Sequence, residues 1–249
     1  MESVVAVRDL ELFVTERGEG DALVLLHGMT GSHADWELVF DLDELARSYR
    51  VLALDARGHG RSTNPSGRFS HREGARDLLA LLDTLGVERY YGIGLSLGAN
   101  TLLHAAIAAP ERAAGLVLVA ATTHFPEQAR AIMRSVNPDA MPESEWQTMR
   151  ARHPRGDAQI RALWQHARDF ADSTDDMNLS AADLAEVIAP TLVVNGDRDP
   201  LYPGEISVSL FRGLPRASLF VIPGGGHGPI FEEFREAFAR AALAFLRTA

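Results

Sequence analysis

The sequence contains a serine whose glycine neighbours suit nucleophilic catalysis. Ser96 stands midway between Gly94 and Gly98, after a predicted strand at 89–93 and before a predicted helix at 97–109. A nucleophilic serine projects from a sharp strand-to-helix turn, where side chains two residues before and after it would clash with neighbouring backbone. The spacing therefore predicts a nucleophile at Ser96, and a glycine-rich connection without chemistry is the alternative interpretation.

The same segment does not fit a nucleotide-binding loop. The fingerprint G-x-G-x-x-G, started at Gly92, requires glycine at position 97, where the sequence has Leu97. A G-x-x-x-x-G-K-[ST] loop is absent as well. These spacings exclude nucleotide binding at this turn.

A serine hydroxyl needs a base to take its proton, and the base needs a third group that orients it. His227 follows the last predicted strand in a glycine-rich loop, which can carry a side chain over the end of a sheet. Two aspartates, Asp197 and Asp199, follow the predicted strand at 191–195. We expect Asp199 to be the acid and Asp197 to stabilise the turn. Because His227 must be neutral to act as the base, we also expect activity to fall under acid conditions.

Negative charge that develops on a substrate oxygen requires prepositioned donors, which form an oxyanion hole. One predicted donor is the backbone N–H of Leu97, at the positive end of the helix that follows Ser96. The second is the backbone N–H of Met29, in the loop after the predicted strand at 22–26.

The elements that must position these residues alternate between strands and helices. Two runs, 4–7 and 11–15, predict an antiparallel start. Six continuous apolar runs predict strands covered on both faces, at 22–26, 50–54, 89–93, 115–120, 191–195 and 218–222. Segments with helical spacing lie between or after them, at 72–85, 97–109 and 231–246. This order predicts an α/β fold, a mostly parallel eight-stranded sheet flanked by helices.

One interval, 122–187, breaks the alternation and contains several short predicted helices. We expect a helical cap here, inserted into a core formed by residues 1–121 and 188–249. Its aromatic residues Trp146 and Trp164, and His124 at its start, are candidate substrate-pocket residues, with packing inside the cap as the alternative.

These motifs together resemble the α/β-hydrolase fold superfamily, specifically its small bacterial serine esterase, lactonase and haloperoxidase-like branch. The resemblance covers nearly the whole chain. It rests on His27-Gly-Met29, on Asp55-Ala-Arg-Gly-His-Gly-Arg-Ser62, on the Ser96 turn, on Gly196-Asp-Arg-Asp199 and on Gly226-His227. It implies that the Asp55 loop is structural and that the acid is the third residue past Gly196. Related dehalogenases and epoxide hydrolases use aspartate as the nucleophile, so the serine favours acyl transfer.

The sequence therefore predicts an enzyme, a serine esterase that cleaves small carboxylic esters with water through an acyl-enzyme. Ser96, His227 and Asp199 would form its catalytic triad. The same triad can open a lactone or hydrolyse a carbon–carbon bond beside a ketone, and a cofactor-free oxygenase or perhydrolase is a further possibility. From a different class, a non-catalytic receptor of the same fold would bind a small hydrophobic ligand. The sequence leaves these substrates and the oligomeric state open.

Composition limits the partners. The 249 residues carry 34 acidic and 24 basic side chains, a formal charge of −10, which disfavours nucleic-acid binding. There are no cysteines, which excludes a disulfide framework and a thiolate metal site. No signal peptide and no apolar run long enough to cross a membrane is recognised, so we expect a cytoplasmic protein. No metal or cofactor is expected, because the triad needs none.

Overall fold

The sheet of the protein has eight strands in the order β1-β2-β4-β3-β5-β6-β7-β8, as described by a computed structural model that covers residues 1–249. β1 pairs antiparallel with β2, and β2 pairs antiparallel with β4, whereas all other neighbours are parallel. The strands are β1 Glu2–Val7, β2 Leu10–Arg17, β3 Ala22–Leu26, β4 Arg50–Leu54, β5 Tyr90–Leu95, β6 Ala113–Val119, β7 Thr191–Gly196 and β8 Ala217–Ile222. The predicted mostly parallel eight-stranded sheet is confirmed.

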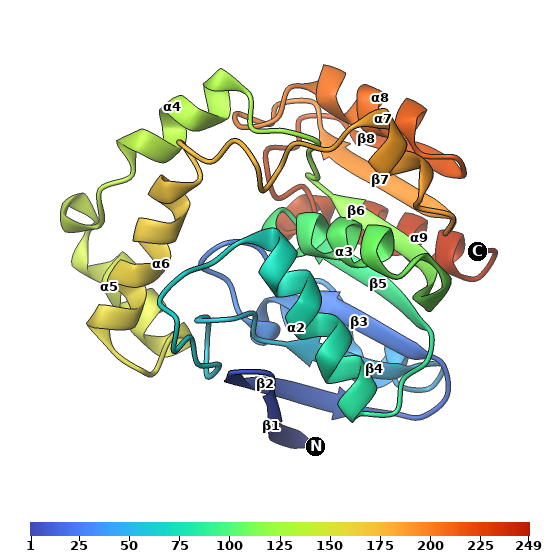
Figure 1. Cartoon of the computed structure of the whole chain (residues 1–249), viewed down its shortest axis with the longest axis horizontal. Helices are drawn as coiled ribbons and strands as arrows, with labels where there is room; N and C mark the ends of the chain where they lie inside the picture. Colours follow the sequence, from blue (N-terminus) through green and yellow to red (C-terminus); the bar gives the residue numbers. More distant parts are fainter.

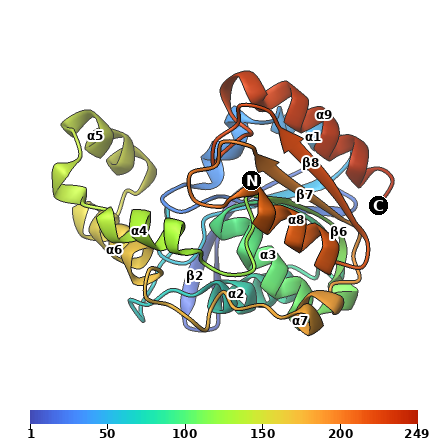
Figure 2. The same cartoon turned by 90° about the horizontal axis from the view of Figure 1, so that it is seen from above.

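Helices cover both faces of this sheet, as Figures 1 and 2 show. The α-helices are α1 Leu42–Leu45, α2 His71–Thr84, α3 Leu97–Ala108, α4 Glu127–Ser135, α5 Glu143–Arg152, α6 Asp157–Asp169, α7 Ala181–Ala185, α8 Gly204–Gly213 and α9 Arg235–Leu246. Short 3₁₀ helices are η1 His33–Leu38, η2 Pro110–Arg112, η3 Pro138–Ala140 and η4 Glu232–Phe234. In Figure 2, α1 and α9 lie on one side of the sheet, while α2, α3, α7 and α8 lie on the other.

The alternation of side chains along the strands explains the two hydrophobic layers. Val24 and Leu26 of β3 face the layer that contains α2, α3 and α8, while Leu23 and Leu25 face the layer of η1, α1 and α9. All four side chains are buried, as expected for a strand inside a parallel sheet. β8 was expected to be covered on both faces, but it is an edge strand, and Val221 on it is exposed.

Four helices, α4, η3, α5 and α6, lie together beyond one end of the sheet (Figure 1), and we call this group the cap. The predicted insertion at 122–187 is longer than this group of helices. Its last helix, α7, packs beside α8 on the core, where Leu184 is buried. A small core of its own holds α5 against α6 through Trp146, Met149 and Ile160. In Figure 1 the cap lies beyond the carboxyl ends of the parallel strands.

The loop that follows β4 is structural. The buried carboxylate of Asp55 accepts hydrogen bonds from the backbone N–H groups of His33 and Arg61, each at 2.8 Å. The hydroxyl of Ser62 donates to the Asp55 carbonyl at 2.7 Å and accepts from the Phe13 N–H at 2.9 Å. These bonds attach the loop to η1 and to β2.

Candidate active site

Ser96 lies on the turn between β5 and α3 with a strained backbone. Its φ of 50° and ψ of −107° lie in a region that side-chain-bearing residues rarely occupy. A side chain at Gly98 would overlap the carbonyl group of Leu26, and one at Gly94 would overlap the first turn of α3. The Ser96 N–H donates to the Val119 carbonyl at 2.8 Å and ties the turn to β6. The two glycines and this bond hold the hydroxyl above the end of the sheet.

His227 connects the serine to a carboxylate. Its Nδ1 lies 3.0 and 2.9 Å from the two carboxylate oxygens of Asp199, and its Nε2 lies 2.8 Å from the Oγ of Ser96. A carboxylate can only accept, so Nδ1 carries the hydrogen and Nε2 of the neutral ring accepts from the serine O–H. This arrangement can remove a proton from the hydroxyl as its oxygen attacks a carbonyl.

Asp199 is the better placed of the two aspartates. Its buried carboxylate also accepts from the N–H groups of Leu201 and Tyr202, at 2.8 and 3.1 Å. Asp197 instead accepts from the Gly224 N–H at 2.6 Å and remains partly exposed. The structure thus brings Ser96, His227 and Asp199 together and leaves Asp197 in the turn.

His27 fixes the peptide that carries the candidate oxyanion donor. Its Nε2 accepts from the Ala56 N–H at 3.0 Å, so its Nδ1 carries the hydrogen and donates to the Gly28 carbonyl at 2.7 Å. That carbonyl also accepts from the Gly31 N–H at 3.0 Å. In a trans peptide the next N–H points the opposite way, and the Met29 N–H has no partner within the protein. Met29 and Gly28 both line the cavity described next.

The cavity beside Ser96 has a volume of about 290 Å³ and a mainly apolar lining. Leu97, the other candidate oxyanion donor, lines it as the first residue of α3, whose N–H has no partner within the helix. Seven further side chains in the lining come from the cap helices α4 and α6 and from residues next to their ends. They are Phe125, Ile132, Met133, Val136, Trp164, Ala167 and Phe170.

Two of the pocket candidates from the sequence do not line this cavity. His124 is exposed and pairs with Asn178 in an isolated bridge. Trp146 is buried inside the cap, where its Nε1–H donates to the Pro138 carbonyl at 3.2 Å and Arg150 and Arg161 lie over its ring. Helical spacing identifies a buried face, but it does not distinguish the cavity from the core of the cap.

His71, which the sequence did not single out, lines the cavity from the start of α2. Its side chain is bound to Asp176 in the segment after α6, 105 residues later in the chain. The only local signal was its position directly after Ser70, which caps α2 through the Glu73 N–H. A histidine at the start of a predicted helix does not by itself indicate a particular chemistry.

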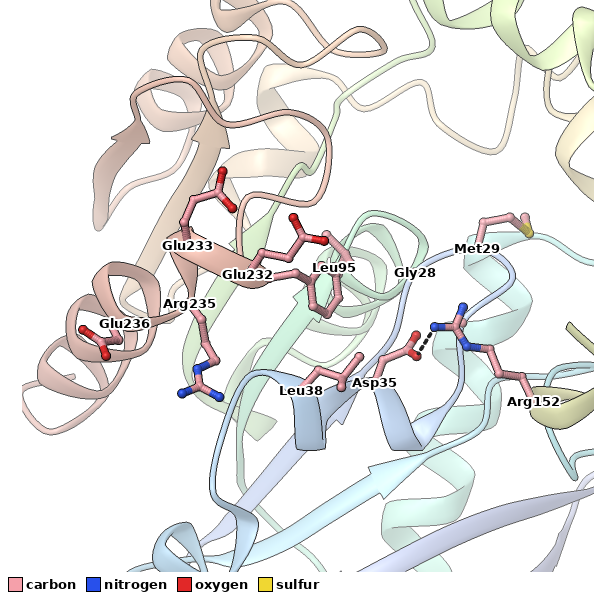
Figure 3. A pocket seen from close by; sticks show the side chains of 12 residues that line it. Gly28, Met29, Asp35, Leu38, Leu95, Arg152, Glu232, Glu233, Arg235 and Glu236 are labelled. Atoms are coloured by element: carbon pink, nitrogen blue, oxygen red, sulfur yellow. Dashed lines mark ion pairs between the residues drawn. The ribbon is translucent and has the colours of Figure 1, made fainter. Parts of the chain in front are cut away.

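A wider groove of about 820 Å³ adjoins the cavity and shares Gly28, Met29 and Leu95 with it (Figure 3). Asp35 of η1 and Arg152 of α5 form an ion pair at 3.2 Å across one side of the groove. The opposite side carries η4 and the start of α9, with three glutamates and one arginine. Those residues are Glu232, Glu233, Glu236 and Arg235. The groove contains neither Ser96 nor His227, and it lies beside the cavity that both residues line.

Three buried histidines lie close together where the cap meets the core. The ring centroids of His27 and His59 are 4.9 Å apart, and those of His59 and His153 are 6.1 Å apart. Burial lowers the pKa of His27 and His153 and lowers that of His59 well below its usual range, because desolvation disfavours the charged ring. His153, at the end of α5, accepts from the Gly60 N–H at 2.9 Å and donates to the Thr30 carbonyl at 3.0 Å. It therefore connects the cap to the loop that carries Met29.

Neither a cluster of three or more potential metal-binding side chains nor a helix long and apolar enough to cross a bilayer occurs in the structure.

Comparison with known proteins identifies the family. Residues 23–241 match the alpha/beta hydrolase family, and the chain belongs to it. The chain is 30% identical to the 2-hydroxy-6-oxononadienedioate/2-hydroxy-6-oxononatrienedioate hydrolase 2 of Pseudomonas putida, over 96% of this chain and 92% of that protein. The resemblance inferred from the sequence motifs is confirmed at the level of the family.

Solved structures agree with this assignment. A thermophilic esterase from Thermogutta terrifontis superposes with a TM-score of 0.74 at 25% identity, covering 100% of this chain and 98% of that one. A hydrolase from Pseudomonas aeruginosa gives a TM-score of 0.78 at 27% identity, covering 98% of both chains.

Proposed function

We propose that the protein is a serine hydrolase that cleaves small carboxylic esters through an acyl-enzyme. His227 takes the proton of Ser96 while Oγ attacks the ester carbonyl, and Asp199 stabilises the imidazolium that forms. The N–H groups of Met29 and Leu97 bind the oxyanion. His227 then protonates the leaving alcohol, and the same imidazole activates the water that releases the acid.

The observation that carries this proposal is the continuous hydrogen-bonded order of Asp199, His227 and Ser96. Both contacts of the imidazole lie within the 2.6–3.2 Å range typical of acid–base partners. The strained backbone of Ser96 supports the same role, because such strain is concentrated at functional sites.

Hydrolysis of a carbon–carbon bond beside a ketone is the second candidate, and the name of the Pseudomonas putida relative supports it. The substrate in that name is a dioate, which carries two carboxylates. No arginine lines the 290 Å³ cavity here, and the chain contains no lysine, so a substrate carboxylate in it would have no cationic side chain as partner. The lining of this cavity therefore favours an uncharged ester or lactone over a substrate that places a carboxylate in it.

The test compares wild type with Ser96→Ala on p-nitrophenyl esters of short fatty acids. We expect the variant to lose about 10⁴-fold or more in kcat. Ser144→Ala, on the exposed surface of α5, is the matched control and should keep the wild-type rate. A Ser96→Ala variant with wild-type rates contradicts the proposal. Product analysis on ester, lactone and β-diketone panels then separates the three bond types.

A further inference from the structure

A second histidine–aspartate pair faces the same cavity. The Nδ1 of His71 lies 2.7 Å from the carboxylate of Asp176, which also accepts from the backbone N–H groups of His71 and Arg72, at 3.0 and 3.2 Å. Only 2% and 7% of the two side chains are exposed. His104 donates from Nε2 to the Asp176 carbonyl oxygen at 2.8 Å and fixes the segment from behind. The catalytic proposal uses none of these groups.

The carboxylate of Asp176 determines which nitrogen of His71 carries the hydrogen. Burial acts to raise the pKa of Asp176, but the hydrogen bonds from His71 and from the start of α2 outweigh it and lower the pKa to about 2. The carboxylate is therefore ionised and can only accept. The hydrogen of the neutral imidazole is on Nδ1, and the lone pair is on Nε2.

The other nitrogen of His71 is open to the cavity. Nε2 has no hydrogen-bond partner in the protein and is not fully buried, and His71 lines the cavity. Phe170 stacks on the ring with centroids 4.7 Å apart and planes at 23°, and Phe125 flanks it at 6.0 Å. Packing and the Asp176 bond thus hold an accepting nitrogen in a fixed direction within an apolar cavity.

An alcohol is the group that this site fits. The pair repeats the atomic order of Asp199 and His227, in which Nδ1 donates to a carboxylate and Nε2 accepts from an O–H group. A substrate carboxylate would lie near Asp176 with no cationic side chain in the lining. A ketone or an ester oxygen would offer Nε2 no hydrogen. We propose that the cavity binds the part of the substrate that carries a hydroxyl group, and that the Nε2 of His71 accepts a hydrogen bond from this hydroxyl.

The proposed contact makes His71 a specificity-determining residue, and it rests on the proposed hydrolase function. An alkyl chain in the cavity excludes water from Nε2 and gives it no hydrogen bond in return. A hydroxyl at the right distance donates a hydrogen bond to Nε2 and so replaces the lost water. The difference corresponds to about one neutral hydrogen bond, which gives a selectivity of roughly five- to tenfold.

The experiment measures kcat/KM for pairs of esters that differ only in one hydroxyl. One set is p-nitrophenyl esters of alkanoic and hydroxyalkanoic acids from butanoate to octanoate, with keto and carboxyl analogues. The other set is alkyl and hydroxyalkyl acetates, followed by acid release, and it shows which side of the ester occupies the cavity. We expect the wild type to prefer the hydroxylated member roughly five- to tenfold at one chain length.

His71→Asn is the central variant, because asparagine can keep a donor to Asp176 but has no atom at the place of Nε2. The ratio of hydroxylated to plain ester should fall to about one in this variant. His124→Asn, the same change at an exposed position, should keep the wild-type ratio. Asp176→Asn is the second variant: its amide can donate to Nδ1, so Nε2 becomes a donor and the preference should move from the hydroxyl to the keto ester.

A wild-type ratio near one at every chain length, or a preference for the keto or carboxyl analogue, overturns the inference. So does a ratio that His71→Asn leaves unchanged. Hydrolysis that survives Ser96→Ala contradicts the proposed function instead, so the two failures are distinguishable.

Discussion

The Nε2 atom of His227 lies 2.8 Å from the Oγ of Ser96, although 131 residues separate them in the chain. The contact forms because β5 and β8 run parallel in one sheet, so the loops after them reach the same edge. The loop after β7 reaches that edge too and brings Asp199 to the other side of the imidazole. The parallel strands thus bring three residues that are far apart in the chain together at one end of the sheet.

Asp199→Asn should lower kcat by about 10³- to 10⁴-fold, because an amide no longer stabilises the imidazolium or fixes the tautomer of His227. Asp197→Asn is the matched control, since Asp197 accepts from the Gly224 N–H and makes no hydrogen bond to His227. Steady-state kinetics on one p-nitrophenyl ester measures both. A large loss in Asp197→Asn with little loss in Asp199→Asn would reverse the two assignments.

His27→Phe should lower kcat about ten- to a hundredfold with a smaller change in KM. Phenylalanine keeps the bulk of the ring but removes the bonds that hold the Gly28 carbonyl and the Ala56 N–H. The Met29 N–H then loses its fixed direction, and its share of oxyanion stabilisation acts only in the transition state. Kinetics together with thermal unfolding separates this effect from loss of folding. An unchanged kcat in a folded variant would remove Met29 from the oxyanion hole.

The free energy of unfolding should fall as the pH drops below about 6.5. Burial lowers the pKa of His27, His59 and His153 in the folded chain, so the unfolded chain binds more protons in this range. Their stabilisation is therefore present above the unfolded pKa and is lost in acid, with a slope of up to about 1.4 kcal/mol per pH unit for each proton. Urea unfolding between pH 8 and pH 5 measures it.

His153→Gln tests one member of this group, because it removes a titrating ring that links α5 to the Thr30 and Gly60 backbone. The slope of stability against pH should become shallower in this variant. His124→Gln, at an exposed site, should leave the slope as it is. Equal slopes in all three proteins would mean that His153 takes up its proton alike in the folded and unfolded chains.

Trp164→Ala should shift the preferred acyl chain toward longer esters, because Trp164 lines the cavity and its loss enlarges it. Trp146→Phe should leave the chain-length profile unchanged, since Trp146 packs inside the cap between Arg150 and Arg161. A series of p-nitrophenyl esters of increasing length measures both profiles. The same shift in both variants would indicate that the cap as a whole, rather than Trp164, sets the length.

The sequence could predict the residues at the ends of strands, because each of them follows a recognisable apolar run. Ser96 and Asp199 are of this kind, and the structure brings both to His227. His71 could not be predicted, since its partner Asp176 comes from an irregular segment after α6 that no periodicity describes. Trp146 and Trp164 lie on neighbouring helices, and the apolar spacing in the sequence does not distinguish them. The packing of α5 on α6 decides that Trp164 reaches the cavity and Trp146 does not.

The most direct test of the account is covalent labelling by a fluorophosphonate, read by intact mass and by peptide mapping. A serine activated by His227 should take up one phosphonyl group on Ser96 within minutes, and His227→Ala should abolish the reaction. A wild-type protein that stays unlabelled, or that carries the group on another residue, would contradict the assignment of Ser96 as the nucleophile.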